Sequence, residues 1–401
     1  MKYIMRNKIS SLLAFSAMMI FSSCNKDVEQ ITGPAVTPPS GLAIGETIAA
    51  SANDSMYYRI ITKAGMVATL NNKANTYTVF VPDNNAIIAS IGSQAAATAY
   101  ISSLSATNAA GIVSYNIIGQ KFTSAAFTTT FPNVQLPTQI GLDPTIPFIR
   151  MSTFLSNNNG QNYVNNIPVG VVDITAANGV IHKPLAIVAP TPLTLKGLIA
   201  TDANTKYWRA AIPRCDSGQI GLARFDSLLN YGLTNMTVLI PNDAAFQSVL
   251  IGTLVGNGVP PATATALVTA VDASGNPTIF QNPALWPVLT AATVRGILAY
   301  HFLASNTGTT GFQPNYRAFS VNFSSTASLK QTLVNNGVAV HPGVLAKATF
   351  TGPIATSLTF ASYGTFPPGG TPFSYVANTV TKDKHAVNGV YHLIDKVLLP
   401  Q

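Results

Sequence analysis

One motif occurs twice in this chain, near its middle and at its end, and it constrains the possible folds more than any other feature. The first copy is Asn178-Gly179-Val180-Ile181-His182 and the second is Asn388-Gly389-Val390-Tyr391-His392. In each copy a proline, Pro190 or Pro400, follows the asparagine by twelve residues. A repeat with this spacing predicts that the chain contains two similar domains.

A second pair of segments lies upstream and recurs in the same order. Thr78-Val79-Phe80-Val81-Pro82-Asp83-Asn84 corresponds to Thr237-Val238-Leu239-Ile240-Pro241-Asn242-Asp243. The β-branched and apolar run predicts a strand, which Pro82 or Pro241 ends because proline cannot donate to the ladder. The Asp or Asn after the proline is typical of a helix N-cap. Two unlike motifs in the same order favour an internal duplication over chance similarity.

Two helical patterns flank this strand. An apolar stripe at helical spacing ends at Gly65, in the position of a helix C-cap, and consists of Tyr57, Ile60, Ile61 and Ala64. A later helix carries Tyr115 in the first copy and Tyr300 in the second. Its inward face is expected to be Ala109, Ile112, Val113 and Asn116, or Val294, Ile297, Leu298 and His301. The stripe is kept, but Asn116 stands where the second copy has His301.

The remaining segments of each copy are predicted to be short strands separated by Asn, Gly and Pro turns. In the first copy they are Phe148–Met151, Asn162–Asn166 and Val169–Ile174. In the second they are Val321–Phe323, Leu329–Val334, Val338–His341 and Phe373–Val380. Each half of the 401 residues is long enough to bury a core. The small share of charged residues, 9%, suits β-rich domains with neutral polar surfaces.

The N-terminus has the order of a targeting segment. Basic residues precede the apolar run Ile9–Phe21, which is too short to span a bilayer, and two serines then precede Cys24. This order resembles the bacterial lipoprotein signal, whose cleavage leaves the cysteine as the first residue, carrying lipid. An ordinary signal peptide with an incidental cysteine is the alternative. We expect residues 1–23 to be removed and Cys24 to be lipidated.

Residues 24–43 are expected to form a flexible tether, because Thr32–Gly41 is too rich in Pro, Gly and Thr to pack. Cys215 is the other cysteine, so a lipidated Cys24 leaves no pair for a disulfide. The net charge of +8 includes the leader, and no basic run or stripe is present, which makes nucleic acid a poor partner. No mature run is long and apolar enough for a transmembrane helix, and lipid would be the only membrane attachment.

The order of these elements and the closing motif resemble the fasciclin domain, present twice, over residues 44–190 and 191–401. The second copy matches the family pattern more closely, with Tyr300-His301 and an unbroken Asn388–Pro400. The first departs at Asn116 and at Pro184–Ala186, where the family has an Ile-Asp-Lys run. The resemblance implies an α+β fold in which each domain is a wedge or sandwich of β-sheet with flanking helices. It also implies adhesion or ligand binding outside the cell, without a defined catalytic centre.

The second copy is longer between its motifs. Pro82 and Tyr115 are 33 residues apart, but Pro241 and Tyr300 are 59 apart, so extra chain lies around Gly252–Leu289. Long loops of this kind are more often functional or mobile than structural. Aromatic residues in the long segments could stack on a sugar or a protein partner, although we favour a core position for them. They are Trp286, Tyr316, Tyr363, Phe366 and Phe373.

The sequence shows no pattern of a catalytic or metal centre. Its five histidines form no HxxxH or HExxH pair, and its acids are too scattered to complete a metal site. His182 and His392 recur at one position, and a His on a half-buried strand usually makes a hydrogen bond within the fold. The same interpretation applies to His301. There is no GxSxG elbow, no His beside Cys215 and no Gly-rich phosphate loop. We expect no enzyme activity, no metal and no cofactor.

Three hypotheses follow for the function. The first is a lipid-anchored adhesion or binding protein of the cell envelope, on the outer membrane and exposed at the surface, that recognises an extracellular polysaccharide or protein. The second is a structural spacer or accessory subunit that packs against other envelope proteins. The third, which we favour least, is a hydrolase with a site in the insertions of the second copy.

Overall fold

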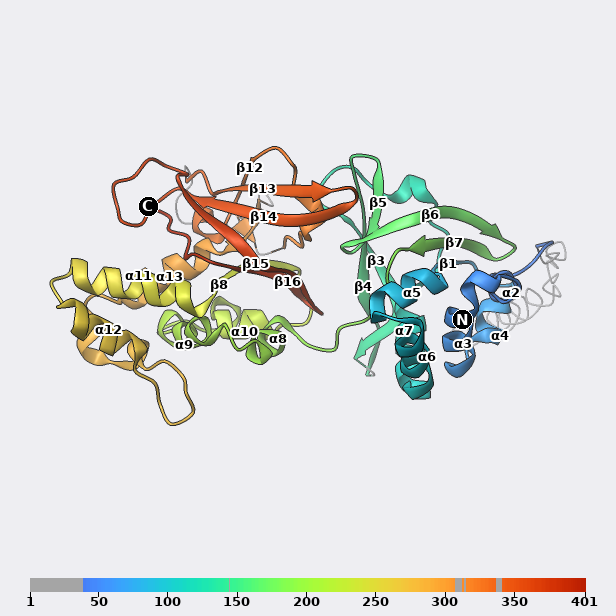
Figure 1. Ribbon diagram of the computed structural model, residues 1–401, viewed down its shortest axis with the longest axis horizontal. Helices are drawn as coiled ribbons and strands as arrows, with labels where there is room; N and C mark the ends of the chain where they lie inside the picture. The colour runs from blue at the N-terminus through green and yellow to red at the C-terminus, as the bar shows by residue number, and fades with distance from the viewer. Residues whose placement is uncertain (1–38, 144, 307–311, 314, 337–340) are drawn as a thin grey trace, which may run out of the picture. The chain divides into compact units, whose positions relative to one another are not determined.

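The computed structural model describes residues 39–143, 145–306, 312–313, 315–336 and 341–401. Cys24, the predicted leader and most of the predicted tether lie outside the described residues. The described part of the chain is built as two repeats of mixed α+β structure (Figure 1). Seven strands of the first repeat form a closed barrel, and the described strands of the second form one seven-stranded and one two-stranded sheet. Figure 1 also shows the helices of each repeat gathered on one side of its strands. The predicted fold class is therefore confirmed.

The first repeat places most of its helices before its long strands. Its helical elements are α2 (Ile44–Ala50), η1 (Ala52–Asp54), α3 (Ser55–Lys63), α4 (Val67–Asn71), α5 (Asn84–Ile91), α6 (Gln94–Ser103), α7 (Ala106–Tyr115) and η2 (Ser124–Ala126). Its strands are β1 (Tyr77–Phe80), β2 (Ile117–Ile118), β3 (Val134–Asp143), β4 (Ile146–Asn158), β5 (Gln161–Val164), β6 (Ile167–Ala176) and β7 (Gly179–Pro184).

The second repeat has the same order with additional elements. Its helical elements are α8 (Leu195–Thr201), α9 (Lys206–Cys215), η3 (Gly221–Ala223), α10 (Phe225–Asn230), α11 (Asp243–Gly256), α12 (Pro261–Thr269), η4 (Ile279–Gln281), η5 (Pro283–Leu285), α13 (Ala291–Tyr300), η6 (Ser320–Asn322) and η7 (Leu333–Asn336). Its strands are β8 (Met236–Pro241), β9 (Phe302–Leu303), β10 (Ser305–Asn306), β11 (Phe312–Gln313), β12 (Ser328–Lys330), β13 (Val344–Thr351), β14 (Ile354–Ser362), β15 (Tyr375–Ala386) and β16 (Gly389–Ile394).

The two repeated motifs meet in space as a parallel pair of strands. In the first repeat β1 lies beside β7, with Thr78 opposite Val180. In the second repeat β8 lies beside β16, with Thr237 opposite Val390. Both pairs have the same register, which the sequence alone did not determine. The internal duplication therefore extends from sequence to strand pairing.

Alternation along the central strand divides each repeat between two apolar cores. Val79 and Val81 of the first repeat face the helices, whereas Phe80 faces the opposite side of the sheet. In the second repeat Val238 faces the helices and Leu239 faces the opposite side of the sheet. Successive side chains of a strand point to opposite faces, so one short apolar run can serve both cores.

Several local predictions are confirmed. Tyr57, Ile60 and Ile61 are fully buried on α3, and Gly65 after it has a φ of 69°, a left-handed conformation that favours glycine. Asp83 after Pro82 accepts a hydrogen bond from Ala86 N at 2.8 Å and caps α5. Asn242 after Pro241 caps α11 through Ala245 N, also at 2.8 Å. Both prolines therefore stand at the junction of strand and cap.

Some strand predictions were wrong, mainly in the second repeat. Val321–Phe323 is not a strand but overlaps the 3-10 turn η6, and only the start of Leu329–Val334 is extended, in β12. Residues 338–340 lie outside the described part of the chain. The long strands β13 and β14 were missed because alanines such as Ala346 and Ala348 supply much of their buried face. Alanine is depleted in strands and gives a weak pattern.

The insertion of the second repeat is not a structureless loop, which corrects the prediction for Gly252–Leu289. It extends α11, adds α12 with Pro261 at its first position, and continues through η4 and η5. Its buried side chains belong to the helix-side core of the repeat, and they are Leu254, Ala264, Val268, Ile279, Phe280, Leu285 and Leu289. Apolar burial, rather than local periodicity, holds this segment in place.

The asparagine of the repeated motif bridges the start of one helix and the end of another. Asn178 Oδ1 accepts from Ile44 N at 2.8 Å, and its Nδ2 donates to Leu70 O at 2.9 Å and Asn72 O at 3.1 Å. In the second repeat Asn388 accepts from Leu195 N at 2.7 Å and donates to Leu229 O and Tyr231 O, both at 3.0 Å.

The glycine after this asparagine leaves room for the neighbouring strand. Gly179 has a φ of 145°, and a Cβ atom there would lie 1.9 Å from Tyr77 O. A Cβ atom on Gly389 would lie 2.6 Å from Met236 O. Any side chain at these positions would therefore separate the two parallel strands.

Replacing Asn178 should destabilise the first repeat strongly. Asn178→Ala removes three buried hydrogen bonds, and at about 1 kcal/mol each we expect the free energy of unfolding to fall by about 3 kcal/mol. Urea denaturation followed by circular dichroism measures this change. Asn85→Ala is the control, because the Asn85 side chain is exposed on α5 and has no hydrogen-bond partner among the described residues. Equal stability of the two variants would contradict the bridging role.

Candidate functional site

The paired histidines of the repeated motif are buried and bonded within the fold. Asp173 N donates to His182 Nδ1 at 3.2 Å, so Nε2 carries the proton and donates to Phe122 O at 2.8 Å. In the second repeat Asp383 N donates to His392 Nδ1 at 3.3 Å, and Nε2 lies 3.1 Å from Ala318 O. Burial lowers the pKa of both histidines. The predicted structural role of His182 and His392 agrees with this geometry.

Asp173 and Asp383, which the motif search missed, hold these histidines in place. Their φ angles are 62° and 58°, and each lies at a bulge of the strand before the motif. The Asp173 carboxylate accepts from the backbone N of Ser124 at 2.8 Å and from its hydroxyl. Asp383 binds Ser320 in the same way, with 2.6 Å to the backbone N. An Asp five residues before the motif asparagine in both copies was the available signal.

Ser, Asp and His thus lie together in each repeat, but not in the arrangement of a nucleophile and its base. The serine hydroxyl donates to the carboxylate, and the histidine Nε2 faces a backbone carbonyl. A catalytic serine would instead need its hydroxyl on the imidazole. The cluster ties the bulge to the segment at η2 or η6 and closes the sheet.

Asn116 and His301 each join their helix to the terminal segment of the repeat, through different atoms. His301 Nδ1 lies 2.8 Å from Ile297 O, one helical turn back, and Leu398 N donates to its Nε2 at 3.0 Å. Asn116 Nδ2 donates to Ile112 O at 2.8 Å and to Val188 O at 2.7 Å. Val188 and Leu398 each stand ten residues after the motif asparagine. The two side chains therefore join the same helix to the same terminal segment, as the sequence suggested.

The tyrosines before them are buried and also satisfied. Tyr115 Oη donates to Ser152 O at 3.1 Å, and Tyr300 Oη donates to Gly343 O at 2.6 Å. Burial raises the pKa of both phenols. Neither is available as an acid near neutral pH, so their role is to join the helix to the sheet.

The two remaining histidines also lack the surroundings of a metal ligand. His341 Nε2 lies 2.7 Å from Pro400 O, and Gly343 N donates to its Nδ1. His385 Nε2 lies 3.2 Å from the Arg317 guanidinium, and burial with this cation lowers the His385 pKa to about 3. Within the described ranges, no three His, Cys, Asp or Glu side chains gather as metal ligands.

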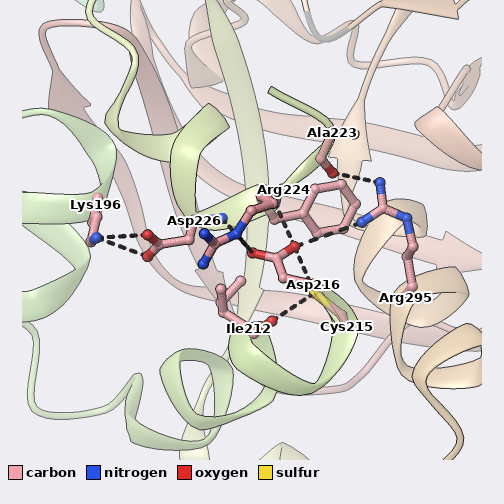
Figure 2. Close-up of polar contacts among 9 residues, drawn as sticks. Lys196, Ile212, Cys215, Asp216, Ala223, Arg224, Asp226 and Arg295 are labelled. Carbon is pink, nitrogen blue, oxygen red and sulfur yellow. Dashed lines mark hydrogen bonds and ion pairs between the residues drawn. The ribbon is translucent and has the colours of Figure 1, made fainter. Parts of the chain in front are cut away.

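A buried carboxylate organises the loop between α9 and α10. Asp216 accepts from Phe225 N at 2.7 Å and from Asp226 N at 2.9 Å, and its carboxylate lies between two arginines (Figure 2). Arg295 is 3.7 Å away and Arg224 is 4.0 Å away. Arg295 also donates to Ala223 O at 2.7 Å and covers the Phe225 ring. These contacts hold the loop against α13.

Cys215 takes part in this cluster as a buried thiol. Its Sγ donates to Ile212 O at 3.1 Å and lies 3.6 Å from the Asp216 carboxylate. Burial and the adjacent carboxylate raise the pKa of the Cys215 thiol. A thiol held in its neutral form is a poor nucleophile, so this cysteine is part of the core.

The main cavity of the second repeat is an apolar pocket of about 370 Å³. Its walls come from α11, α13, η4, the segment before α13, Phe366 with Pro368, and the C-terminal segment. Its buried lining residues are Phe246, Val249, Leu250, Phe280, Leu289, Val294, Leu298 and Val397. Three lining residues are polar, namely Thr253, Asn257 and Thr293. Among the described residues that line the pocket, none is ionisable. Such a pocket can accept an apolar group but offers no acid, base or nucleophile of ordinary strength.

The preference for core positions is wrong for Trp286 and Tyr363 but agrees with the packing of Tyr316 and Phe366. Trp286 is 41% exposed and Tyr363 is 39% exposed, while Tyr316, Phe366 and Phe373 are half-buried. Trp286 carries the Arg214 guanidinium on its ring at 4.5 Å, and Tyr363 packs edge-on against Phe373. Tyr316 and Phe366 are partly buried because each packs against an apolar core of the second repeat.

Comparison with known proteins links the first repeat to one family. Residues 53–183 match the model of the fasciclin domain. Over these residues the chain is similar to a fasciclin domain. The match falls on the first repeat, although the second had seemed closer to the family pattern. The second repeat shares the strand register and motif hydrogen bonds of the first, so the two repeats have the same arrangement around the motif.

One solved structure similar to this chain is a FAS1 domain pair from the insect cell adhesion molecule fasciclin I. The identity is 12% with a TM-score of 0.33, over 86% of this chain and 96% of that one. No curated protein matches the chain.

Neutralising Asp216 should destabilise the second repeat. Asp216→Asn removes the charge between two arginines, and with hydrogen bonds to charged groups contributing about 2 kcal/mol we expect a loss of that size in unfolding free energy. Thermal and urea unfolding measure it. The control is Asp226→Asn in the same cluster, where the ion pair with Lys196 is exposed and should contribute less than about 1 kcal/mol. A larger loss in the control would contradict this account.

His301→Asn should reduce the dependence of stability on pH. Burial lowers the His301 pKa to about 4, below the 6.5 of an unperturbed histidine, so the unfolded chain takes up the proton first. Stability is therefore fully present above pH 6.5 and falls as the pH drops towards 4, by up to about 3 kcal/mol from this group.

The comparison of interest is between the unfolding free energies of the variant and the wild type across this pH range. In the variant, the unfolding free energy should no longer fall with pH by the amount that His301 contributes. The variant should stay folded at neutral pH, because Asn116 makes equivalent bonds in the first repeat. Superimposable pH profiles of wild type and variant would refute the assignment.

Proposed function

We propose that this fasciclin-like protein is a lipid-anchored binding protein of the cell envelope that recognises an extracellular polysaccharide or protein. The association of fasciclin domains with adhesion supports a binding role. The basic and apolar leader that ends at Cys24 supports the anchor and a place on the outer membrane. None of the described helices combines the length and apolar character needed to cross a bilayer.

The observation that carries the choice of binding over catalysis is the chemistry of the pocket in the second repeat. This pocket borders the insertion in which a hydrolase site had been considered. Its lining is apolar apart from two threonines and one asparagine, and it brings no carboxylate, imidazole or thiol to a bound group. Hydrolysis of a glycan or an ester needs such groups to move protons or to attack. Binding needs none of them.

A structural or accessory subunit is the second candidate, and exposed apolar side chains favour it. Phe148 near the turn between β3 and β4 is 82% exposed, and Ile220 beside η3 is 84% exposed. An apolar surface patch is often covered by a partner protein, whereas single exposed apolar side chains are common on any protein, so this candidate ranks second. In this alternative the chain would pack against other envelope proteins and have no separate ligand.

The anchor is tested by replacing its cysteine. Cys24→Ala should move the protein from the membrane fraction to the soluble fraction, because without the lipid no membrane attachment remains. Cys215→Ala is the matched control: this thiol is buried in the second repeat, so the variant should stay with the membranes. Fractionation followed by immunoblotting gives the result, and undiminished membrane retention of Cys24→Ala would refute the anchor.

Two further measurements separate the candidate functions. Protease shaving of intact cells should remove a surface-exposed protein and spare one that faces the periplasm. Pull-down from detergent extracts should recover an extracellular polymer or protein if the adhesion proposal is right. A stoichiometric membrane partner without any retained polymer would favour the accessory subunit instead.

A further inference from the structure

We infer that the apolar pocket of the second repeat is a binding site for an uncharged ligand with an alkyl chain or a small aromatic group, and that Phe366 forms the wall that closes it. This inference goes beyond the proposed function, because it assigns to the pocket a ligand of its own, separate from the polysaccharide or protein proposed above. It concerns the isolated site and does not depend on the membrane anchor.

The lining excludes a charged ligand. Its buried side chains are carbon-only groups such as Leu250, Val294 and Leu298. An ion transferred into such surroundings would lose its hydration without gaining a partner, which is strongly unfavourable. The polar residues Asn257 and Thr293 are exposed, so they stand at the solvent side of the pocket. They can bond to a hydroxyl or carbonyl group that remains there.

The size of the pocket favours a small molecule or a single side group. Its volume of about 370 Å³ lies near the lower end of the range of roughly 300 to 1,000 Å³ that is typical of ligand pockets. Each methylene group buried there would contribute favourably through the hydrophobic effect.

One wall of this pocket is built from a part of α11 that has no counterpart in the first repeat. The helices α5 and α11 begin at equivalent caps, Asp83 and Asn242. The first of them, α5, ends at Gly92, which has a φ of 112°. The second repeat has Ile251 at that position and continues the helix to Gly256. The lining residues Gly252, Thr253 and Gly256 therefore belong to a helical extension without a counterpart in the first repeat.

Gly252 explains how Phe366 reaches this wall. A Cβ atom on Gly252 would lie 2.3 Å from the Phe366 ring, so the ring packs directly on the helix backbone. Glycine inside a helix is unfavourable by roughly 0.5–1 kcal/mol relative to alanine, and here it makes room for the ring. A Cβ atom on Gly256, one turn later, would meet nothing within 4 Å. The close approach is therefore specific to the residue under Phe366.

The test uses the chain with Cys24→Ala, which avoids detergent, and N-phenylnaphthylamine, an uncharged dye whose emission rises in apolar surroundings. The dye should bind with saturation, and decanol should displace it. Thr253→Trp, which places a large ring on the half-buried wall, should weaken dye binding at least tenfold. Thr265→Trp on the exposed face of α12 is the matched control and should bind as before.

A second pair of variants tests the wall itself. Gly252→Ala should push the Phe366 ring away and weaken dye binding several-fold, whereas Gly296→Ala, where a Cβ meets nothing within 4 Å, should not. Absence of saturable dye binding to the parent chain would overturn the inference. So would wild-type affinity in both Thr253→Trp and Gly252→Ala. Failure of the anchor or of partner retention would refute the proposed function and leave this titration unaffected.

Discussion

The buried asparagine at the start of the last strand is the contact on which each repeat depends. A parallel strand pair joins β1 to β7 and β8 to β16, and helix ends lie directly beside the start of the closing strand. Those ends leave backbone groups that have no partner within their own helices. Asn178 and Asn388 satisfy three such groups each. The glycine that follows allows the strands to approach closely.

The other polar residues of the motif extend this network. His182 and His392 fix a bulge through Asp173 and Asp383, and Asn116 or His301 ties the tyrosine helix to the terminal segment. Because these side chains are occupied within the fold, binding is left to surfaces and cavities. The repeats differ most at the helix-side core of the second, where the insertion and the loop at Phe366 enclose the apolar pocket.

Predictions from the sequence succeeded where short-range chemistry decides the structure. The cap at Asp83, the left-handed Gly65 and the stripe on α3 follow from local patterns. Predictions failed where packing overrides local preference. The alanine-rich faces of β13 and β14 gave little strand signal, and the insertion became ordered only because the apolar core buries it. The role of Asp173 was also missed, since its positive φ and its contact with Ser124 depend on strand pairing.

The sequence by itself determined the duplication, the boundaries of the motif strands and the structural character of the paired histidines. These properties depend on residue type and on spacing within a few turns or strands. Only the tertiary structure decided that an uncharged pocket exists and that Phe366 closes it against Gly252. A pocket is made of surfaces from segments far apart in the chain, and apolar side chains fill any available space without a fixed spacing. Their meeting is therefore set by packing and is not visible in the order of residues.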